Sequence, residues 1–174
     1  VREEEEWLSA GFEERVGGRG LGAKGWAPQV VILNHPSVGA FVTHCGWNSV
    51  TEGVSAGVPM ITWPLVFEQF INERLLVRLL RVGLRLYEGF RSTLWEEAAK
   101  LVVGREVIAR VVARFAPGAD EEVEEMRRRA KELAAAARAA VAEGGASHRD
   151  INCLIEELKT ESFRLKEEAK AFLD

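Results

Sequence analysis

The chain has 174 residues, of which 47% are hydrophobic and 29% are charged, and its formal net charge is −4. This length is enough for one domain with a sizeable core, and the weak negative charge gives no support for nucleic acid or an anionic membrane as a partner. The apolar runs fall far short of the roughly 20 residues that a membrane-spanning helix needs. The two cysteines, Cys45 and Cys153, form no disulfide framework or metal spacing, which favours the reducing cytoplasm.

The chain begins with a charged segment followed by a glycine-rich one. Residues 1–10 include the run Glu3 to Glu6, and a charge run of this kind is typical of a solvated face. Residues 16–25 contain several glycines, which predict a flexible stretch and a poor strand.

From residue 29 to residue 87, short helices alternate with short apolar strands. The expected helices are 29–33, 48–56 and 68–82, and the expected strands are 38–43, 59–63 and 84–87. Gly57 and Gly83 are expected to end the second and third helices. The third helix has apolar residues at about 3.6 spacing, which predicts a buried stripe; its members are Phe70, Ile71, Leu75, Leu76, Leu79 and Leu80. This alternation favours an α/β fold with a doubly wound parallel sheet.

The second half of the chain is predicted to be mostly helical. Residues 88–101 are poorly periodic and are expected to form a surface excursion. A helix over 105–115 is expected to turn Val107, Ile108, Val111 and Val112 inward. Residues 119–142, rich in Glu, Arg and Ala, predict one long helix. Ser147 is expected to cap a further helix, and residues 160–174 to form an amphipathic or loose tail.

The most informative segment runs from the strand at residues 38–42 through His44, Gly46 and Asn48 into a helix. Ligands of parallel α/β sheets bind at the carboxyl ends of strands, beside helix N-termini, and the free N–H groups there suit a phosphate. His44, Asn48 and Ser49 can add donors, whereas Glu52 can accept hydrogen bonds from hydroxyl groups such as those of a ribose. Trp26 and Trp47 offer flat faces for a base or a sugar.

This segment resembles the signature box of plant secondary-product glycosyltransferases, a family that uses UDP-sugars. The family box runs from a Trp to a Gln over 44 residues, as residues Trp26 to Gln69 do here. The matching positions are Trp26, Gln29, His35, Pro36, Phe41, His44, Gly46, Asn48, Ser49, Glu52, Gly57, Pro59, Pro64 and Gln69. The resemblance implies a Rossmann-like C-terminal lobe of a GT-B fold that lacks its first strand, with C-terminal helices, and without the acceptor-binding N-terminal lobe.

The resemblance also implies a role for each site residue. Trp26 would stack on the uracil ring, and the Ala27 backbone would bond its edge. Gln29 and Glu52 would hold the ribose; His44, Asn48 and Ser49 would hold the diphosphate; Trp47, Glu68 and Gln69 would hold the sugar. Gln69 favours glucose, and Glu68 stands where the family usually has Asp. The family needs no divalent metal, and no Asp-x-Asp pair occurs in this sequence.

The expected function follows from the same resemblance. The parent enzyme would transfer glucose from UDP-glucose to a hydroxyl group of a small plant acceptor, a flavonoid, terpenoid or hormone, with inversion. Its base, a His paired with an Asp, is expected in the missing lobe, so the chain alone would be inactive. The expected domains are a donor-binding core at 1–87, the rest of the lobe at 88–159 and a tail at 160–174. Two alternatives remain open: a non-catalytic nucleotide-sugar-binding remnant, and a helical interaction protein.

Overall fold

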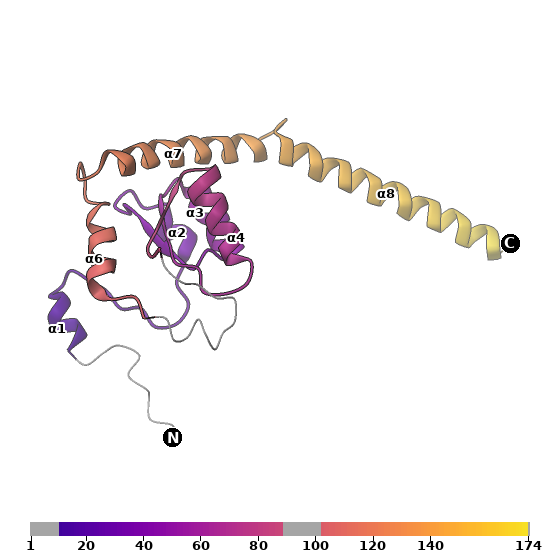
Figure 1. Ribbon diagram of the computed structural model, residues 1–174. Coiled ribbons are helices and arrows are strands. Elements are labelled where there is room, and N and C mark those ends of the chain that lie inside the picture. Colours follow the sequence, from indigo (N-terminus) through magenta and orange to yellow (C-terminus); the bar gives the residue numbers. More distant parts are fainter. Residues whose placement is uncertain (1–10, 89–101, 174) are drawn as a thin grey trace, which may run out of the picture.

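The structure, a computed structural model, describes residues 11–88 and 102–173 (Figure 1). The predictions made for residues 1–10, and nearly all of the surface excursion expected at 88–101, lie outside the described residues. Within them, the chain forms a parallel sheet with helices packed around it, and a long helix that extends away from this body.

The described sheet has three parallel strands, β1 (Phe41–Thr43), β2 (Met60–Thr62) and β3 (Gly83–Arg85), in the order β1-β2-β3. Val42 is paired with Ile61, which is paired with Leu84. All three strands were predicted, but the paired segments are shorter than expected. Because the strands are parallel, their carboxyl ends lie at one edge of the sheet, where a ligand is expected.

Two short helices precede and follow β1. Helix α2 (Gln29–Leu33) has the predicted bounds. Helix α3 (Trp47–Ala56) begins one residue before the predicted start and ends at Gly57, whose φ of 73° is the left-handed conformation expected there. A further five-residue helix, α1 (Phe12–Val16), lies near the start of the described chain.

The helix predicted over residues 68–82 is the part of the fold that differs most from expectation. It forms as α4 (Gln69–Arg74), which continues directly into a π-helical turn, η1 (Leu75–Leu79). A π turn advances the helix by an extra residue and rotates the face that follows. The predicted apolar stripe is wrong in part: Leu79, within the π turn, is 74% exposed, and Ile71, which precedes the turn on α4, is 70% exposed.

Two polar residues take the place of those apolar ones on the buried face of α4: Asn72 and Glu73 are 8% and 1% exposed. The helix also ends before Gly83, because Arg81 adopts the left-handed conformation, with φ of 54°. Gly83 is instead the first residue of β3, where an added Cβ atom would lie 3.0 Å from the Cβ atom of Leu76. The missing side chain of Gly83 therefore allows close packing against Leu76. The prediction that Gly83 ends the helix is wrong.

The long helix α7 (Glu121–Val141) covers the core and crosses above α3 in Figure 1. Asp120 caps it, with Oδ1 accepting hydrogen bonds from the N–H groups of Glu122 and Val123. Its buried residues repeat at helical spacing, as a face packed on the core should; they are Val123, Met126, Ala130 and Ala134. Val123, Met126 and Ala130 form the main hydrophobic cluster together with residues of the sheet, η1 and α3, such as Met60, Ile61, Leu76 and Val50.

Helix α6 (Arg105–Ala113) lies before α7 and supplies partly buried side chains to the same core. Ile108 and Val111 pack against the cluster as predicted, but Val112 is 45% exposed, so its predicted inward position is wrong. Arg114, just after α6, forms ion pairs with Asp120 and Glu122. The hydrogen bond from Arg114 lowers the pKa of the Asp120 carboxyl group.

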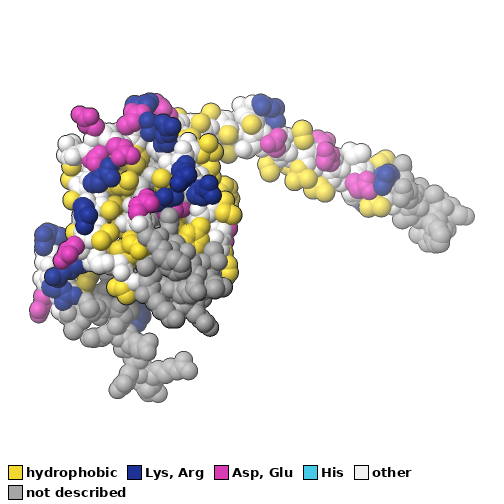
Figure 2. Space-filling model, in the orientation of Figure 1, with side chains coloured by type: hydrophobic (Ala, Val, Ile, Leu, Met, Phe, Trp, Pro, Cys, Tyr) yellow, Lys and Arg dark blue, Asp and Glu magenta, His cyan; other side chains and the backbone are white. Residues whose placement is uncertain are grey.

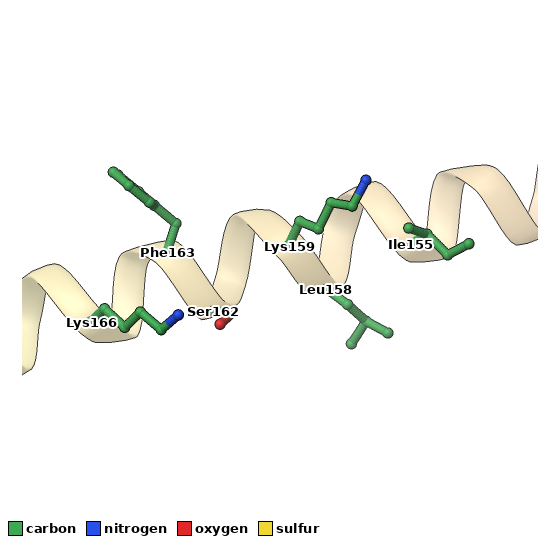
Figure 3. A pocket seen from close by; sticks show the side chains of 6 residues that line it. All are labelled: Ile155, Leu158, Lys159, Ser162, Phe163 and Lys166. Carbon is green, nitrogen blue, oxygen red and sulfur yellow. The ribbon is translucent and has the colours of Figure 1, made fainter.

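Helix α8 (Ala146–Leu173) is continuous over 28 residues and extends away from the body (Figure 1). It begins before Ser147, so Ser147 lies inside the helix and the predicted capping role is wrong. Apolar side chains appear along it in Figure 2; those exposed are Ile151, Leu154, Ile155, Leu158, Phe163 and Leu165. Figure 3 shows Leu158 and Phe163 pointing to opposite sides of the helix, so these residues do not form one narrow stripe.

Candidate donor-binding site

The turn between β1 and α3 is the centre of the candidate site. Thr43 ends β1, Cys45 has a left-handed backbone with φ of 64°, and Gly46 is the extended residue that precedes the helix. Gly46 has no side chain to bond the first N–H groups of α3, and those groups have no acceptor within an α-helix. The turn therefore presents backbone donors and the positive end of a helix dipole at the carboxyl edge of the sheet.

His44 and Cys45 point to opposite sides of this turn. Cys45 is fully buried in the core, whereas His44 is exposed. The imidazole of His44 lies over Gly46, since a Cβ atom added to Gly46 would stand 2.5 Å from His44 Nε2. The absence of a side chain at Gly46 thus makes room for an imidazole donor beside the start of α3.

Gln29, Ser49 and Glu52 are brought together from two helices. Nε2 of Gln29, at the start of α2, donates a hydrogen bond of 2.7 Å to Glu52 Oε2 and lies 3.5 Å from Ser49 Oγ. Ser49 and Glu52 are three residues apart on α3 and so share a face. The cluster offers a carboxylate, a carboxamide and a hydroxyl group about one helical turn from the N–H donors at the start of α3. This arrangement suits a diol attached to a phosphate.

The two candidate tryptophans are both exposed. Trp26 is 98% exposed in the segment before α2, and Trp47, the first residue of α3, is 55% exposed. Between Trp26 and α2, the carbonyl group of Ala27 accepts a hydrogen bond of 2.8 Å from the Gln29 N–H group. The large apolar faces of both tryptophans are available for stacking.

Glu68 and Gln69 lie at the start of α4, after the carboxyl end of β2. Glu68 is exposed, whereas Gln69 is half-buried, and its Oε1 accepts hydrogen bonds from the N–H groups of Leu65 and Val66 at 2.8 and 3.1 Å. The carbonyl side of the Gln69 amide therefore closes the loop at residues 65–69, and its NH₂ side is the part suited to bonding a ligand oxygen.

Asn72 is a site residue that the sequence reasoning missed. Its Nδ2 atom donates a buried hydrogen bond of 2.9 Å to the carbonyl oxygen of Cys45. The available signal was the adjacent polar pair, Asn72 and Glu73, between Ile71 and Arg74 of the helix expected at 68–82. The predicted stripe placed Phe70 and Ile71 on the buried face instead.

The part of the chain that the structure describes contains no group of three or more His, Cys, Asp or Glu side chains arranged to hold a metal ion. Nor is any helix in residues 11–88 and 102–173 both long and apolar enough to cross a bilayer.

A parallel sheet with a glycine turn, a helix N-terminus and a carboxylate at the carboxyl edge of its strands defines a nucleotide-binding α/β unit. Comparison with known proteins identifies the family to which this unit is similar. Residues 22–105 match the family model described as UDP-glucoronosyl and UDP-glucosyl transferase. The chain belongs to the plant UDP-glycosyltransferase family.

Individual relatives agree with this assignment. UDP-glucosyl transferase 73CC6 of Saponaria officinalis is 52% identical over 157 residues, which cover 88% of this chain and 31% of the relative. Scopoletin glucosyltransferase of Nicotiana tabacum is 49% identical over 158 residues, or 91% of this chain and 32% of the relative. The chain thus spans about a third of the length of the curated relatives it matches.

Solved structures show the same fold. That of Glycyrrhiza uralensis UGT73P12, complexed with glycyrrhetinic acid 3-O-monoglucuronide, has a TM-score of 0.80 and 42% identity over 88% of this chain and 31% of that one. Medicago truncatula UGT71G1, complexed with UDP-glucose, has a TM-score of 0.71 and 35% identity over 84% of this chain and 30% of that one. The predicted α/β fold of GT-B type is confirmed.

Proposed function

We propose that this chain is the donor-binding part of an enzyme that transfers glucose from UDP-glucose to a hydroxyl group of a small plant metabolite, with inversion at the anomeric carbon. The observation that carries the proposal is the cluster of Gln29, Ser49 and Glu52 one helical turn from the start of α3, with His44 over Gly46. A carboxylate beside a helix N-terminus matches a ribose beside a phosphate.

In this proposal, each part of the donor has its own residues. The exposed ring of Trp26 stacks on the uracil, the Ala27 backbone bonds its edge, and Gln29 and Glu52 hold the ribose. His44, Asn48, Ser49 and the first N–H groups of α3 hold the diphosphate. Trp47, Glu68 and the amide NH₂ group of Gln69 hold the glucose; all three are at or next to helix starts on the same sheet edge.

The chemical contribution of these residues is stabilisation of the leaving group. When the acceptor oxygen displaces UDP, negative charge develops on the β-phosphate, and His44, Ser49 and the helix N-terminus are placed to offset it. No divalent metal is needed for that role. The base that deprotonates the acceptor belongs to the remaining two thirds of the relatives' length, and we expect no turnover by this chain alone. The thiols at Cys45 and Cys153 suit the cytoplasm as its location.

The acceptor is proposed only as a class. The scopoletin glucosyltransferase and the abscisate beta-glucosyltransferase among the relatives bear the names of a coumarin and a hormone. Small hydroxylated plant metabolites of this kind are the acceptors that we propose for the parent enzyme.

The test is calorimetric titration of UDP and UDP-glucose into the purified chain and its variants Glu52→Ala and His44→Ala, with His148→Ala as a matched control. His148 lies on α8, the helix that extends away from the body (Figure 1), and its Nδ1 accepts a hydrogen bond from the N–H group of Gly144. We expect saturable binding by the chain and by His148→Ala, and loss of binding in the two site variants. A folded chain that binds neither ligand would contradict the proposal, and equal binding by all four proteins would contradict the placement of the site.

A further inference from the structure

Asn72 is a buried polar side chain to which the donor-binding site assigns no contact with a ligand. It lies on α4, one turn after Gln69, and is 8% exposed. A buried amide has to form hydrogen bonds to offset its loss of hydration, and Asn72 does so with an element distant in sequence: its Nδ2 donates to the carbonyl oxygen of Cys45 at 2.9 Å.

Cys45 is the residue that turns the chain between β1 and α3. Its φ of 64° is unfavourable for a residue with a side chain, so the surroundings have to hold it there. Two side chains do this from opposite ends. Thr43 Oγ1 accepts a hydrogen bond of 3.1 Å from the Cys45 N–H group, and Asn72 donates to the Cys45 carbonyl oxygen.

The second of these bonds also sets the direction of a backbone donor. The carbonyl group of Cys45 and the N–H group of Gly46 belong to one planar trans peptide, in which the two groups point in opposite directions. Since Asn72 holds the carbonyl group toward the protein interior, the Gly46 N–H group is directed away from it. The exposed His44 imidazole lies against the same residue, at the place that a Cβ atom of Gly46 would occupy.

We propose that Asn72 is a positioning residue for the diphosphate of the donor: it locks the Cys45 turn, and through it the Gly46 N–H group and the His44 imidazole. It also joins this turn to α4, whose first residue is Gln69, so that the phosphate and sugar parts of the site are held in one arrangement. The role in binding rests on the proposed function, whereas the locking of the turn does not.

The test uses the full chain with Cys153→Ser, so that Cys45 is its remaining cysteine. Asn72→Leu removes the amide group and keeps a side chain of similar size. Asn72→Asp replaces the NH₂ donor by an acceptor, and it is used if Asn72→Leu does not fold. Asn34→Ala is the matched control, because Asn34 is exposed and its amide bonds only locally, to the carbonyl oxygen of Val30. Val123→Ala controls for lost stability, since Val123 is fully buried on α7, outside the turn.

Two readouts separate positioning from a general loss of structure. The first is binding of UDP compared with uridine, which has the same base and ribose but no phosphate. We expect the Asn72 variants to bind UDP at least tenfold more weakly, with uridine binding unchanged within twofold. Equal losses for UDP and uridine, or unchanged UDP binding, would overturn the proposal.

The second readout does not depend on nucleotide. A thiol reagent modifies the buried Cys45 only when the turn opens, so we expect labelling at least tenfold faster in the Asn72 variants than in Val123→Ala of equal thermal stability. Labelling at the rate of Val123→Ala would overturn the locking role. If labelling accelerates but the unmodified chain binds no UDP, the proposed function fails while the locking of the turn by Asn72 stands.

Discussion

The side-chain amide of Gln29 donates a hydrogen bond of 2.7 Å to the carboxylate of Glu52, and this contact joins the start of α2 to the second turn of α3. The bond orients the carboxylate before any ligand is present. A ribose that binds there would therefore meet an acceptor already held in place, which lowers the cost of ordering side chains on binding.

The first prediction concerns this pair. We expect Glu52→Gln to weaken UDP binding by roughly 10- to 100-fold, because a hydrogen bond to a charged group contributes about 1.5–3 kcal/mol. Gln29→Ala should weaken it less, and the double variant should lose less than the sum of the two changes because the residues act together. Calorimetric titration of the three variants measures this; strictly additive losses would show that the two residues act independently.

The second prediction concerns Gly46. Its φ of −61° and ψ of 145° suit any residue, so Gly46→Ala should leave stability within about 0.5 kcal/mol. The new methyl group would occupy the place of the His44 ring, so UDP affinity should fall about as far as in His44→Ala. Gly104→Ala is the control, because Gly104 precedes α6 with nearly the same backbone and has nothing within 4 Å of an added Cβ atom. Unchanged UDP affinity in Gly46→Ala would contradict this reading of the turn.

The third prediction concerns the buried carboxylate of Glu73. Its oxygens accept hydrogen bonds of 3.0 Å from Thr62 Oγ1 and from Arg85 Nε, which joins α4 to β2 and β3. Glu73→Leu removes the buried one of two carboxylates that pair with the Arg85 guanidinium, which is only 13% exposed and keeps the exposed Glu88 as a partner. We expect a loss of about 3 kcal/mol in the free energy of unfolding, measured with urea.

Lys159→Ala is the control for that measurement. It removes an exposed ion pair with Glu156 on α8, which is expected to contribute less than about 1 kcal/mol. Equal losses in the free energy of unfolding would show that the Glu73 network contributes no more to stability than an exposed ion pair.

The fourth prediction concerns pH. The hydrogen bond from Arg114 lowers the pKa of Asp120 from its usual 3.8, so the folded state favours the carboxylate. The resulting stabilisation is complete above that usual value and is lost as pH falls through the lower value of the folded state. We expect Asp120→Asn, which keeps an oxygen for capping α7, to be less stable than the unmodified chain at pH 7, with the difference shrinking toward pH 3. Urea midpoints across this range measure it, and a constant difference would contradict the assignment.

Much of the fold near the site could be predicted because local signals and tertiary structure agree there. Helix α2 has its predicted bounds, and Gly57 ends α3 as a left-handed residue. Among the candidate site residues, Gln29, Ser49 and Glu52 do lie together. All of the assigned binding roles, including those of Gln29, Trp26 and Gln69, stay predictions.

What could not be predicted depends on contacts between distant segments. The π turn at Leu75–Leu79 changes which residues of η1 face the core, and no local sequence pattern predicts it. Asn72 and Glu73 are buried because their partners, Cys45 and Arg85, reach them from other elements. A search for periodic apolar residues treats such side chains as surface, so it places them on the wrong face.

The left-handed residues in the loops of the candidate site have a consequence for the stability of those loops. Cys45 and Phe67 have φ values of 64° and 52°, and such a backbone costs a residue with a side chain roughly 1–2 kcal/mol. Each is held by neighbouring amides: Asn72 bonds the Cys45 carbonyl oxygen, and Gln69 bonds the loop just before Phe67. Part of the folding free energy thus offsets the strain of these two backbone conformations in the candidate site. In amide hydrogen exchange, these loops should open before the sheet does, and a bound nucleotide should slow their exchange more than that of any strand.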